Sequence, residues 1–133
     1  MINKHQLFIF TIVLVLMDQF LKWLMFNRFS TYITSNKGTI FGWVNNQVIG
    51  YWLLVIGIIS MIWIVFNSDL KKPIYRWSIM LIIAGAISNI IDRVWHGFVI
   101  DFFSFFNLNH FNLADLYLFV GIVLYLWTSF RKK

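Results

Sequence analysis

The sequence predicts an all-α membrane protein, in which four transmembrane helices carry a small β-like element on one side of the bilayer. With 133 residues the chain has room for a single domain, residues 1–133. Hydrophobic residues make up 60% of it and charged residues 12%, against roughly a quarter charged in soluble domains. A domain this small has too much surface to leave so little of it charged in water, so lipid must cover much of it. The same composition excludes a disordered chain.

Four apolar segments approach the roughly 20 residues that a helix needs to cross a bilayer. We expect these spans at residues 7–26, 48–66, 74–91 and 111–130. The first resembles a secretory signal, because Lys4 and His5 precede an apolar run. No small-residue cleavage site follows that run, so we interpret the segment as a retained span. The single proline, Pro73, marks the start of the third span.

The basic residues between the spans predict the orientation of the chain. Seven of the 11 lie on one side if the chain crosses four times, namely Lys4, Lys71, Lys72, Arg76, Arg131, Lys132 and Lys133. The positive-inside rule makes that side cytoplasmic, with both termini inside. The net charge of +6 is then a topology signal and an attraction for anionic lipid headgroups. No nucleic-acid partner is needed to explain it.

The two outer connections are polar or aromatic. Residues 27–47 are rich in Thr, Ser, Asn and Gly, and we expect a short β-like piece at 31–34. Residues 92–110 are heavily aromatic, as suits a segment at the membrane interface. Within them, residues 98–106 fit a short interfacial helix and an irregular loop equally well.

The chain has five acidic residues, all aspartate, and four of them converge on the outer face. Asp69 lies beside two lysines in the inner connection and is most simply a solvated loop charge. Asp18 lies in the outer half of the first span and Asp92 just past the third. Asp101 lies in the aromatic outer segment, and Asp115 in the first turn of the fourth span. Carboxylates at such depth usually pair, line a water-filled cavity or do chemistry.

Three of these four acids also have a purely structural interpretation. Asp18 and Lys22 are spaced i,i+4 and can form an intrahelical ion pair. Asp92, beside Arg93, can serve as a polar anchor at the bilayer surface. Asp115 stands three residues after an asparagine, the spacing of a helix N-cap with an acid at N3, where the helix dipole favours negative charge.

Asp101 is the acid that a structural role explains least well. Apolar residues flank it on both sides, so an isolated carboxyl there needs either a raised pKa or a specific partner. A second carboxylate nearby would let the two groups share a proton, as the dyad of an aspartic protease does.

Other chemistries fit this inventory poorly. Without cysteine the chain has no disulfide, thiolate nucleophile or Cys-type zinc site. The three histidines show no HExxH or similar spacing, and no Walker A, Rossmann or GxSxG motif occurs. Hydrolysis by a carboxylate pair is the enzymology that remains.

The rival class is a non-enzymatic channel or binding scaffold. A transport pathway should place polar residues toward the cytoplasmic side. The inner halves of spans two and four hold few polar residues beyond Ser60, Thr128 and Ser129, which favours a site on one side only.

Five blocks, in order along nearly the whole chain, resemble the motifs of lipoprotein signal peptidases (signal peptidase II). Any one block is a weak signal, but five in order on matching spans are specific. DQFLK at 18–22 resembles D-Q-x-x-K, NKGTIFG at 36–42 is similar to N-x-G-x-x-[FW]-[GS], and AGAISNIIDR at 84–93 resembles G-G-x-x-G-N-x-x-D-R. VIDF at 99–102 resembles V-x-D-F, and FNLAD at 111–115 matches F-N-x-A-D.

The resemblance implies that Asp101 and Asp115 form the catalytic dyad of an aspartic endopeptidase. It implies further residues that position the substrate or support the site, namely Asn36, Gly38, Asn89, Asp92, Arg93, Asn112, Asp18 and Lys22. The implied substrate is a prolipoprotein whose cysteine already carries diacylglycerol, cleaved just before that cysteine. No metal or organic cofactor is expected. The implied protein is a monomer in the bacterial inner (cytoplasmic) membrane, in contact with membrane lipids, with its site facing the periplasm.

The chain departs from the family pattern at a few positions. Ala84 and Ser88 replace two glycines on the face where the third span should pack closely, and Thr39 and Ile40 replace a pair of small residues. The stretch between the two dyad residues is also short, 13 residues. We expect these departures to affect substrate range more than the reaction, and Ser88→Gly to preserve activity or raise it modestly.

Overall fold

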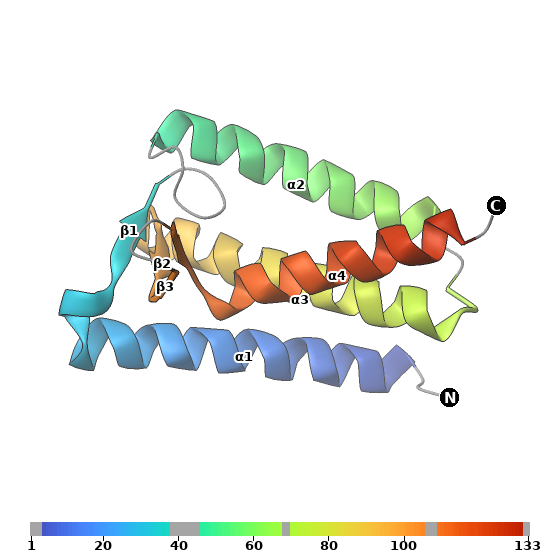
Figure 1. Cartoon of the computed structure of the whole chain (residues 1–133), viewed down its shortest axis with the longest axis horizontal. Helices are drawn as coiled ribbons and strands as arrows, with labels where there is room; N and C mark the ends of the chain where they lie inside the picture. The colour runs from blue at the N-terminus through green and yellow to red at the C-terminus, as the bar shows by residue number, and fades with distance from the viewer. Residues whose placement is uncertain (1–3, 38–45, 68–69, 106–108, 132–133) are drawn as a thin grey trace.

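The computed structural model describes residues 4–37, 46–67, 70–105 and 109–131. Its elements in chain order are α1 (Lys4–Arg28), the 3₁₀ turn η1 (Ser30–Tyr32), β1 (Thr34–Asn36), α2 (Gln47–Asn67), α3 (Pro73–His96), β2 (Val99–Asp101), β3 (Phe103–Phe105), β4 (Asn109–Phe111) and α4 (Leu113–Phe130). Figure 1 shows the long helices lying lengthwise beside one another, with the strands gathered at one end. The first turn of α1 and the last turn of α4 lie at the opposite end. The predicted fold class is confirmed.

All four long helices are sufficiently long and apolar to cross a membrane, which confirms the four predicted spans. The local sequence explains where α3 begins and ends. Pro73 occupies its first turn, where the missing N–H is not needed. Gly97 ends it in a left-handed conformation with φ 75°, and its N–H donates to the carbonyl of Arg93 over 3.0 Å.

The end of α3 differs from the predicted boundary at residue 91. The helix continues to His96, so Asp92 lies within α3 and not just past it. The polar pair Asp92-Arg93 looks like a helix exit in the sequence, but the glycine that can adopt a positive φ comes four residues later.

Both expectations for residues 98–106 were wrong. The described part of this segment forms two short strands, neither an interfacial helix nor an irregular loop. β2 pairs antiparallel with β1, and β3 pairs antiparallel with β4. The strand predicted at 31–34 is likewise displaced, because η1 occupies its first residues and β1 begins at Thr34. The pairing of β1 with β2 joins positions distant in the sequence, so no local pattern sets the boundaries of these two strands.

The helix α3 is the centre of the molecule. Half of its apolar window is buried inside the protein, against 17% for α4, 11% for α1 and 6% for α2. Large apolar side chains point outward from the other three helices, for example Phe8, Trp23, Trp52, Phe66 and Trp127. In a membrane protein this arrangement is expected, because hydrocarbon covers such side chains.

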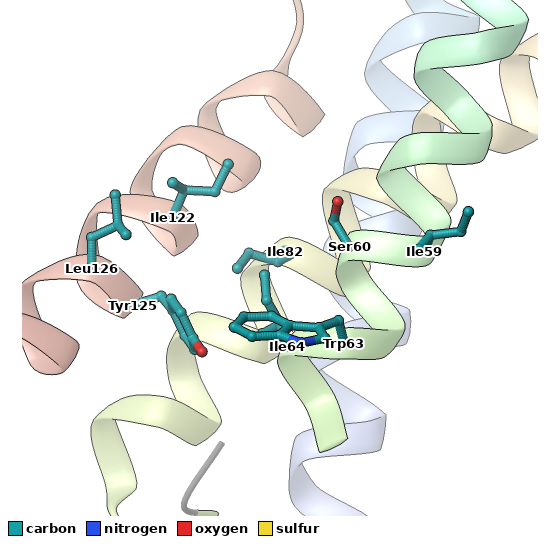
Figure 2. A pocket seen from close by; sticks show the side chains of 8 residues that line it. All are labelled: Ile59, Ser60, Trp63, Ile64, Ile82, Ile122, Tyr125 and Leu126. Carbon is teal, nitrogen blue, oxygen red and sulfur yellow. The ribbon is translucent and has the colours of Figure 1, made fainter. Parts of the chain in front are cut away.

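A groove of about 490 Å³ lies between α2 and α4, with one side chain of α3 at its floor. Figure 2 shows its lining, which is Ile59, Ser60, Trp63, Ile64, Ile82, Ile122, Tyr125 and Leu126. The lining is almost wholly apolar, so hydrocarbon and not water is its physical complement. A water-filled pathway along this groove, as the channel interpretation would need, has almost no polar side chains to support it.

Candidate active site

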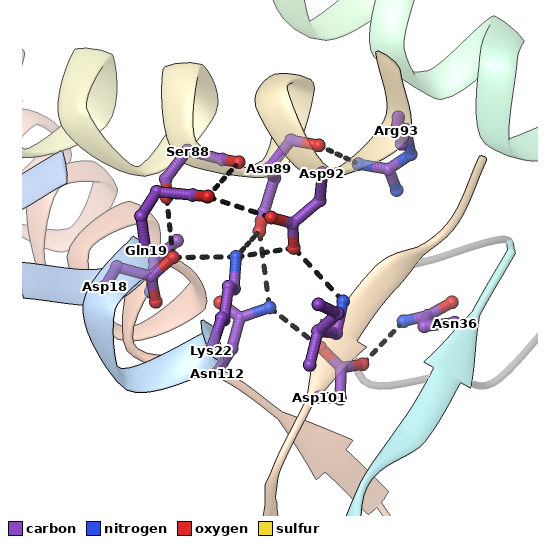
Figure 3. Close-up of polar contacts among 12 residues, drawn as sticks. Asp18, Gln19, Lys22, Asn36, Ser88, Asn89, Asp92, Arg93, Asp101 and Asn112 are labelled. Carbon is purple, nitrogen blue, oxygen red and sulfur yellow. Dashed lines mark hydrogen bonds and ion pairs between the residues drawn. The ribbon is translucent and has the colours of Figure 1, made fainter. Parts of the chain in front are cut away.

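Asp101 ends β2 and is fully buried. The pairing of β1 with β2 places it opposite Thr34 and close to Asn36 at the other end of β1. The side-chain amide of Asn36 donates to Asp101 Oδ2 over 2.9 Å. A second amide, that of Asn112, donates to Asp101 Oδ1 over 2.7 Å. Both oxygens of this carboxyl group therefore accept a hydrogen bond (Figure 3).

Asp115 lies in the first turn of α4 and is 5% exposed. Its backbone N–H donates to Asn112 Oδ1 over 2.9 Å, so Asn112 is the N-cap of α4, as its spacing predicts. The amide of Asn89, from α3, donates to Asp115 Oδ1 over 2.9 Å. The capping interpretation of this motif is confirmed, and it is compatible with a catalytic one.

Asn112 joins the two aspartates. Its Oδ1 accepts from the backbone of Asp115, and this leaves its Nδ2 to donate to Asp101 and, over 3.2 Å, to Asn89 Oδ1. The orientation of an asparagine amide follows from its partners, and here a backbone donor fixes it. The first turn of α4 and the end of β2 are thereby held by a single side chain.

A buried lysine lies at the centre of a second group of acids. Lys22 Nζ lies 2.7 Å from Asp18 Oδ2 and 2.8 Å from Asp92 Oδ2. It also donates to Asn89 Oδ1 over 3.0 Å. The i,i+4 ion pair predicted within the first span is confirmed. Asp92 is 1% exposed and pairs with this lysine, so its interpretation as a surface anchor was wrong.

Asp18 and Asp92 also bind donors other than the lysine. The hydroxyl of Ser88 donates to Asp18 Oδ2 over 2.6 Å, and the backbone N–H of Ala114 donates to Asp18 Oδ1 over 2.9 Å. The side-chain amide of Gln19 donates to Asp92 Oδ1 over 2.8 Å, and the backbone N–H of Ile100 to Asp92 Oδ2 over 3.1 Å.

Sequence reasoning did not assign Gln19 or Ser88 to the site. Both are polar residues in apolar spans, and that was the available signal. The side-chain amide of Gln19 donates to the hydroxyl of Ser88 over 2.9 Å and to its carbonyl over 3.1 Å. These bonds join α1 to α3 beside the acids (Figure 3).

Arg93 lies on the next turn of α3 beyond Asn89. Its guanidinium donates to the carbonyl of Asn89 over 3.4 Å. Gly38, the remaining predicted site residue, lies outside the described residues. No group of three or more His, Cys, Asp or Glu side chains within the described ranges could hold a metal ion.

The pKa of Asp101 is raised from its usual range to about 7. Burial of the carboxyl group is the main cause, and the neighbouring charge of Asp115 adds to it. The amide bonds from Asn36 and Asn112 and the positive charge of Lys22 oppose the shift, because they stabilise the ionised form. A carboxyl group with this pKa holds its proton close to neutral pH, and can therefore donate one in a reaction.

Comparison with known proteins gives a consistent result. Residues 10–131 match the family model described as signal peptidase (SPase) II. The lipoprotein signal peptidase of Halalkalibacterium halodurans is 30% identical over 86% of this chain and 85% of that protein. That of Cupriavidus pinatubonensis is 31% identical over 92% of this chain and 81% of that protein.

Two solved structures, each described as a bacterial membrane enzyme determined by the in meso method, share the fold. The first has a TM-score of 0.80 at 23% identity and covers 96% of this chain and 89% of that one. The second has a TM-score of 0.78 at 23% identity, with 98% and 96% covered.

Proposed function

The chain belongs to the signal peptidase II family, and from this premise we propose that it cleaves prolipoproteins as an aspartic endopeptidase with Asp101 and Asp115 as its catalytic pair. As a member of that family it is a multi-pass bacterial membrane peptidase that removes signal peptides from prolipoproteins. The proposal adds the reaction type, the residues and the position of the cut, just before a diacylglyceryl-modified cysteine.

The observation that carries the proposal is the bridge made by Asn112 between two buried carboxyl groups. It donates to one oxygen of Asp101 and accepts the backbone N–H of Asp115. Asn89 donates to one oxygen of Asp115. One oxygen of each aspartate is thereby held by a fixed amide, so the carboxyl groups are oriented before substrate arrives.

The two carboxyl groups have different surroundings, and this supports different roles. Asp101 is fully buried with a pKa of about 7, which suits the proton donor. Asp115 lies at the N-terminus of α4, where the helix dipole stabilises a negative charge. We assign to Asp115 the base that removes a proton from the attacking water. Asp101 then delivers its proton to the carbonyl oxygen or the leaving nitrogen.

A protonated Asp101 is compatible with its hydrogen bonds. A carboxylic acid oxygen that donates its proton retains the capacity to accept one bond. The amides of Asn36 and Asn112 can therefore remain in place through the proton transfer.

The depth of the site fits a substrate anchored in lipid. The strands lie at one end of the helices (Figure 1), and Asp101 is the last residue of β2 there. Asp115 lies in the first turn of α4, which follows β4. If the basic connections are cytoplasmic, this end lies at the outer face of the membrane. The diacylglyceryl group of a precursor would hold its cysteine at the membrane boundary, and the peptide bond before that cysteine would meet the carboxyl pair there.

The test is cleavage of a diacylglyceryl-modified prolipoprotein by the purified protein, followed as release of the signal peptide. Asp101→Asn and Asp115→Asn should each lower kcat by roughly 10²–10⁴-fold, because asparagine keeps the shape but cannot exchange the proton. The double variant should be little worse than either single one, since a dyad acts as one unit.

Asp69→Asn, in the basic connection between the second and third spans, is the matched control and should cleave normally. Normal cleavage by Asp101→Asn, together with an inactive Asp92→Asn, would reject the pair. In that case Asp92 and Asp115 would be the reactive carboxyl groups.

A further inference from the structure

Two aspartates outside the proposed catalytic pair each accept a backbone hydrogen bond from the residue before one of its members. Asp18 accepts the backbone N–H of Ala114, the residue immediately before Asp115. Asp92 accepts the backbone N–H of Ile100, the residue immediately before Asp101. Each of these carboxylates therefore holds the chain one residue away from a catalytic carboxyl group.

Lys22 connects these two anchoring carboxylates. Its ammonium lies 2.7 Å from Asp18 and 2.8 Å from Asp92, and all three side chains are at most 1% exposed. Charge-assisted bonds of this length, shielded from water, hold their partners in narrow geometry. The distance between the two anchoring carboxylates therefore depends on this one cation.

Lys22 also acts on the catalytic pair through Asn89. An ammonium group only donates hydrogen bonds, so the oxygen of the Asn89 amide must face it, 3.0 Å away. The amide nitrogen must then point the other way, where it donates to Asp115 Oδ1 over 2.9 Å. Lys22, together with the more distant amide of Asn112 on the same oxygen, thereby determines which group Asn89 presents to Asp115.

We propose that Lys22 is a positioning residue of the peptidase, which sets the placement of the two catalytic carboxyl groups by bridging the carboxylates that anchor Ala114 and Ile100 and by orienting Asn89. The inference rests on the proposed assignment of Asp101 and Asp115 as the catalytic pair.

Energetics favour a geometric role over a simple gain in stability. Burying an ammonium and two carboxylates removes the hydration of all three, and the attraction between them repays that cost only when the geometry is good. Here every oxygen of both carboxylates has a donor. Asp18 Oδ2 binds Lys22 and Ser88, and its Oδ1 binds Ala114. Asp92 Oδ2 binds Lys22 and Ile100, and its Oδ1 binds Gln19. Five of these six contacts join two different elements, which supports a role in aligning the elements with one another.

The test is Lys22→Met, which keeps most of the side-chain volume and removes the charge. We expect kcat to fall roughly 100-fold, the loss associated with a displacement of about 1 Å at a reacting group, while KM stays nearly unchanged. The positive charge of Lys22 lowers the pKa of Asp101, so its removal should move the alkaline limb of the kcat–pH profile to higher pH. The other charged groups that act with Asp101 are Asp115 on α4 and Arg93 on α3.

A second variant covers the case in which Lys22→Met does not insert or fold. Lys22→Met combined with Asp18→Asn removes one charge of each sign. The asparagine oxygen can still accept the Ala114 N–H, and its nitrogen can donate to Ser88. This double variant should fold and still show the reduced kcat, because the two anchoring carboxylates are no longer bridged and Asn89 keeps only the longer bond from Asn112 on its oxygen. Arg28→Met, at the exposed end of α1, is the control for loss of a basic residue and should cleave normally.

The outcomes separate this inference from the proposed function. A folded Lys22→Met protein with unchanged kcat overturns the inference. The inference also fails if activity falls only in proportion to the amount of folded protein and the kcat–pH profile does not move. If only the double variant folds, an unchanged kcat in it overturns the inference. Cleavage by Asp101→Asn would instead reject the catalytic pair itself.

Discussion

At the scale of single residues, the carboxyl group of Asp101 makes the pH dependence of cleavage predictable. Its pKa is raised to about 7 by burial and by the charge of Asp115. If Asp101 donates the proton, kcat should be at its plateau below this pH and fall as the pH rises through about 7. The measurement is kcat against pH at saturating lipidated precursor.

The variant Asn36→Ala tests the direction in which the alkaline limb of the kcat–pH profile moves. The amide of Asn36 stabilises the ionised form of Asp101 and so lowers its pKa. Its removal should move the alkaline limb to higher pH. A limb that moves to lower pH in this variant would contradict Asp101 as the proton donor.

The contacts of Ser88 change the expected effect of substituting it. From the family pattern, Ser88→Gly should preserve activity, because the serine replaces a glycine at a close helix contact. In the structure its hydroxyl donates to Asp18 over 2.6 Å and accepts from Gln19. We now predict that Ser88→Ala destabilises the protein by roughly 1.5–3 kcal/mol, the range for a hydrogen bond to a charged group.

Ser88→Gly should be less stable still, since glycine within a helix costs about 1 kcal/mol relative to alanine. The free energy of unfolding in detergent measures both changes. Ser60→Ala, on the exposed face of α2, is the matched control and should change little. Equal stability of Ser88→Gly and the unsubstituted protein would show that the hydroxyl contributes nothing.

Local contacts of the site could be predicted from the sequence, whereas contacts between spans could not. The i,i+4 spacing of Asp18 and Lys22 predicts their ion pair, and the spacing of Asn112 and Asp115 predicts the helix cap. The bond from Asp18 to the backbone of Ala114 joins positions 96 residues apart. It depends on how α1 packs beside the start of α4, and no local pattern encodes that packing.

At the scale of elements, two glycines allow α3 and α4 to approach each other closely. A Cβ on Gly121 would lie 2.8 Å from the carbonyl oxygen of Ser78 and from a side-chain carbon of Ile82. A Cβ on Gly85 would collide with the carbonyl oxygen of Ala114, next to Asp115 of the proposed catalytic pair. Small residues at such crossings are the usual means of close helix packing in membranes.

Gly121→Ala should therefore destabilise the protein by roughly 1–3 kcal/mol, the usual cost of an added methyl group in a well-packed contact. Gly57→Ala is the matched control, because nothing lies within 4 Å of a Cβ at that position. Thermal unfolding in detergent should show a lower Tm for the first variant only. The same Tm for both would mean that the helices separate at no cost.

The elements themselves were predictable to different degrees. Each span is a long apolar run, and the bilayer thickness fixes its length, so the four helices follow from composition. The strands are three residues each, too short for an alternating pattern to be recognised. β1 and β2 exist because they pair with each other although they lie far apart in the chain, for example Ser35 with Ile100, 65 positions later.

At the scale of the whole molecule, the two ends of the helix bundle differ in chemistry. The strands occupy one end (Figure 1), and Asp101 at the end of β2 binds the amides of Asn36 in β1 and Asn112 at the start of α4. The first turn of α1 and the last turn of α4 lie at the other, where Arg131 stacks over the ring of Trp127 at 4.7 Å. Tryptophan is enriched at membrane–water interfaces, and arginine in the loops on the cytoplasmic side.

The difference between the two ends of the bundle makes the membrane topology testable. Seven of the 11 basic residues lie near the termini, in the connection between α2 and α3, or in the first turn of α3. The end opposite the site should therefore face the cytoplasm. A reporter enzyme that is active only outside the inner membrane should be inactive when fused after Lys133 and active when inserted after Lys37, which follows β1. Activity of the carboxyl-terminal fusion would show that the protein is inserted the other way round, with the carboxyl pair on the cytoplasmic side. The acids would still converge, because the fold brings them together whichever way it is inserted. They would, however, face the cytoplasm, whereas the lipidated cysteine of an exported precursor lies on the other side of the membrane. Prolipoprotein cleavage at this site would then be impossible.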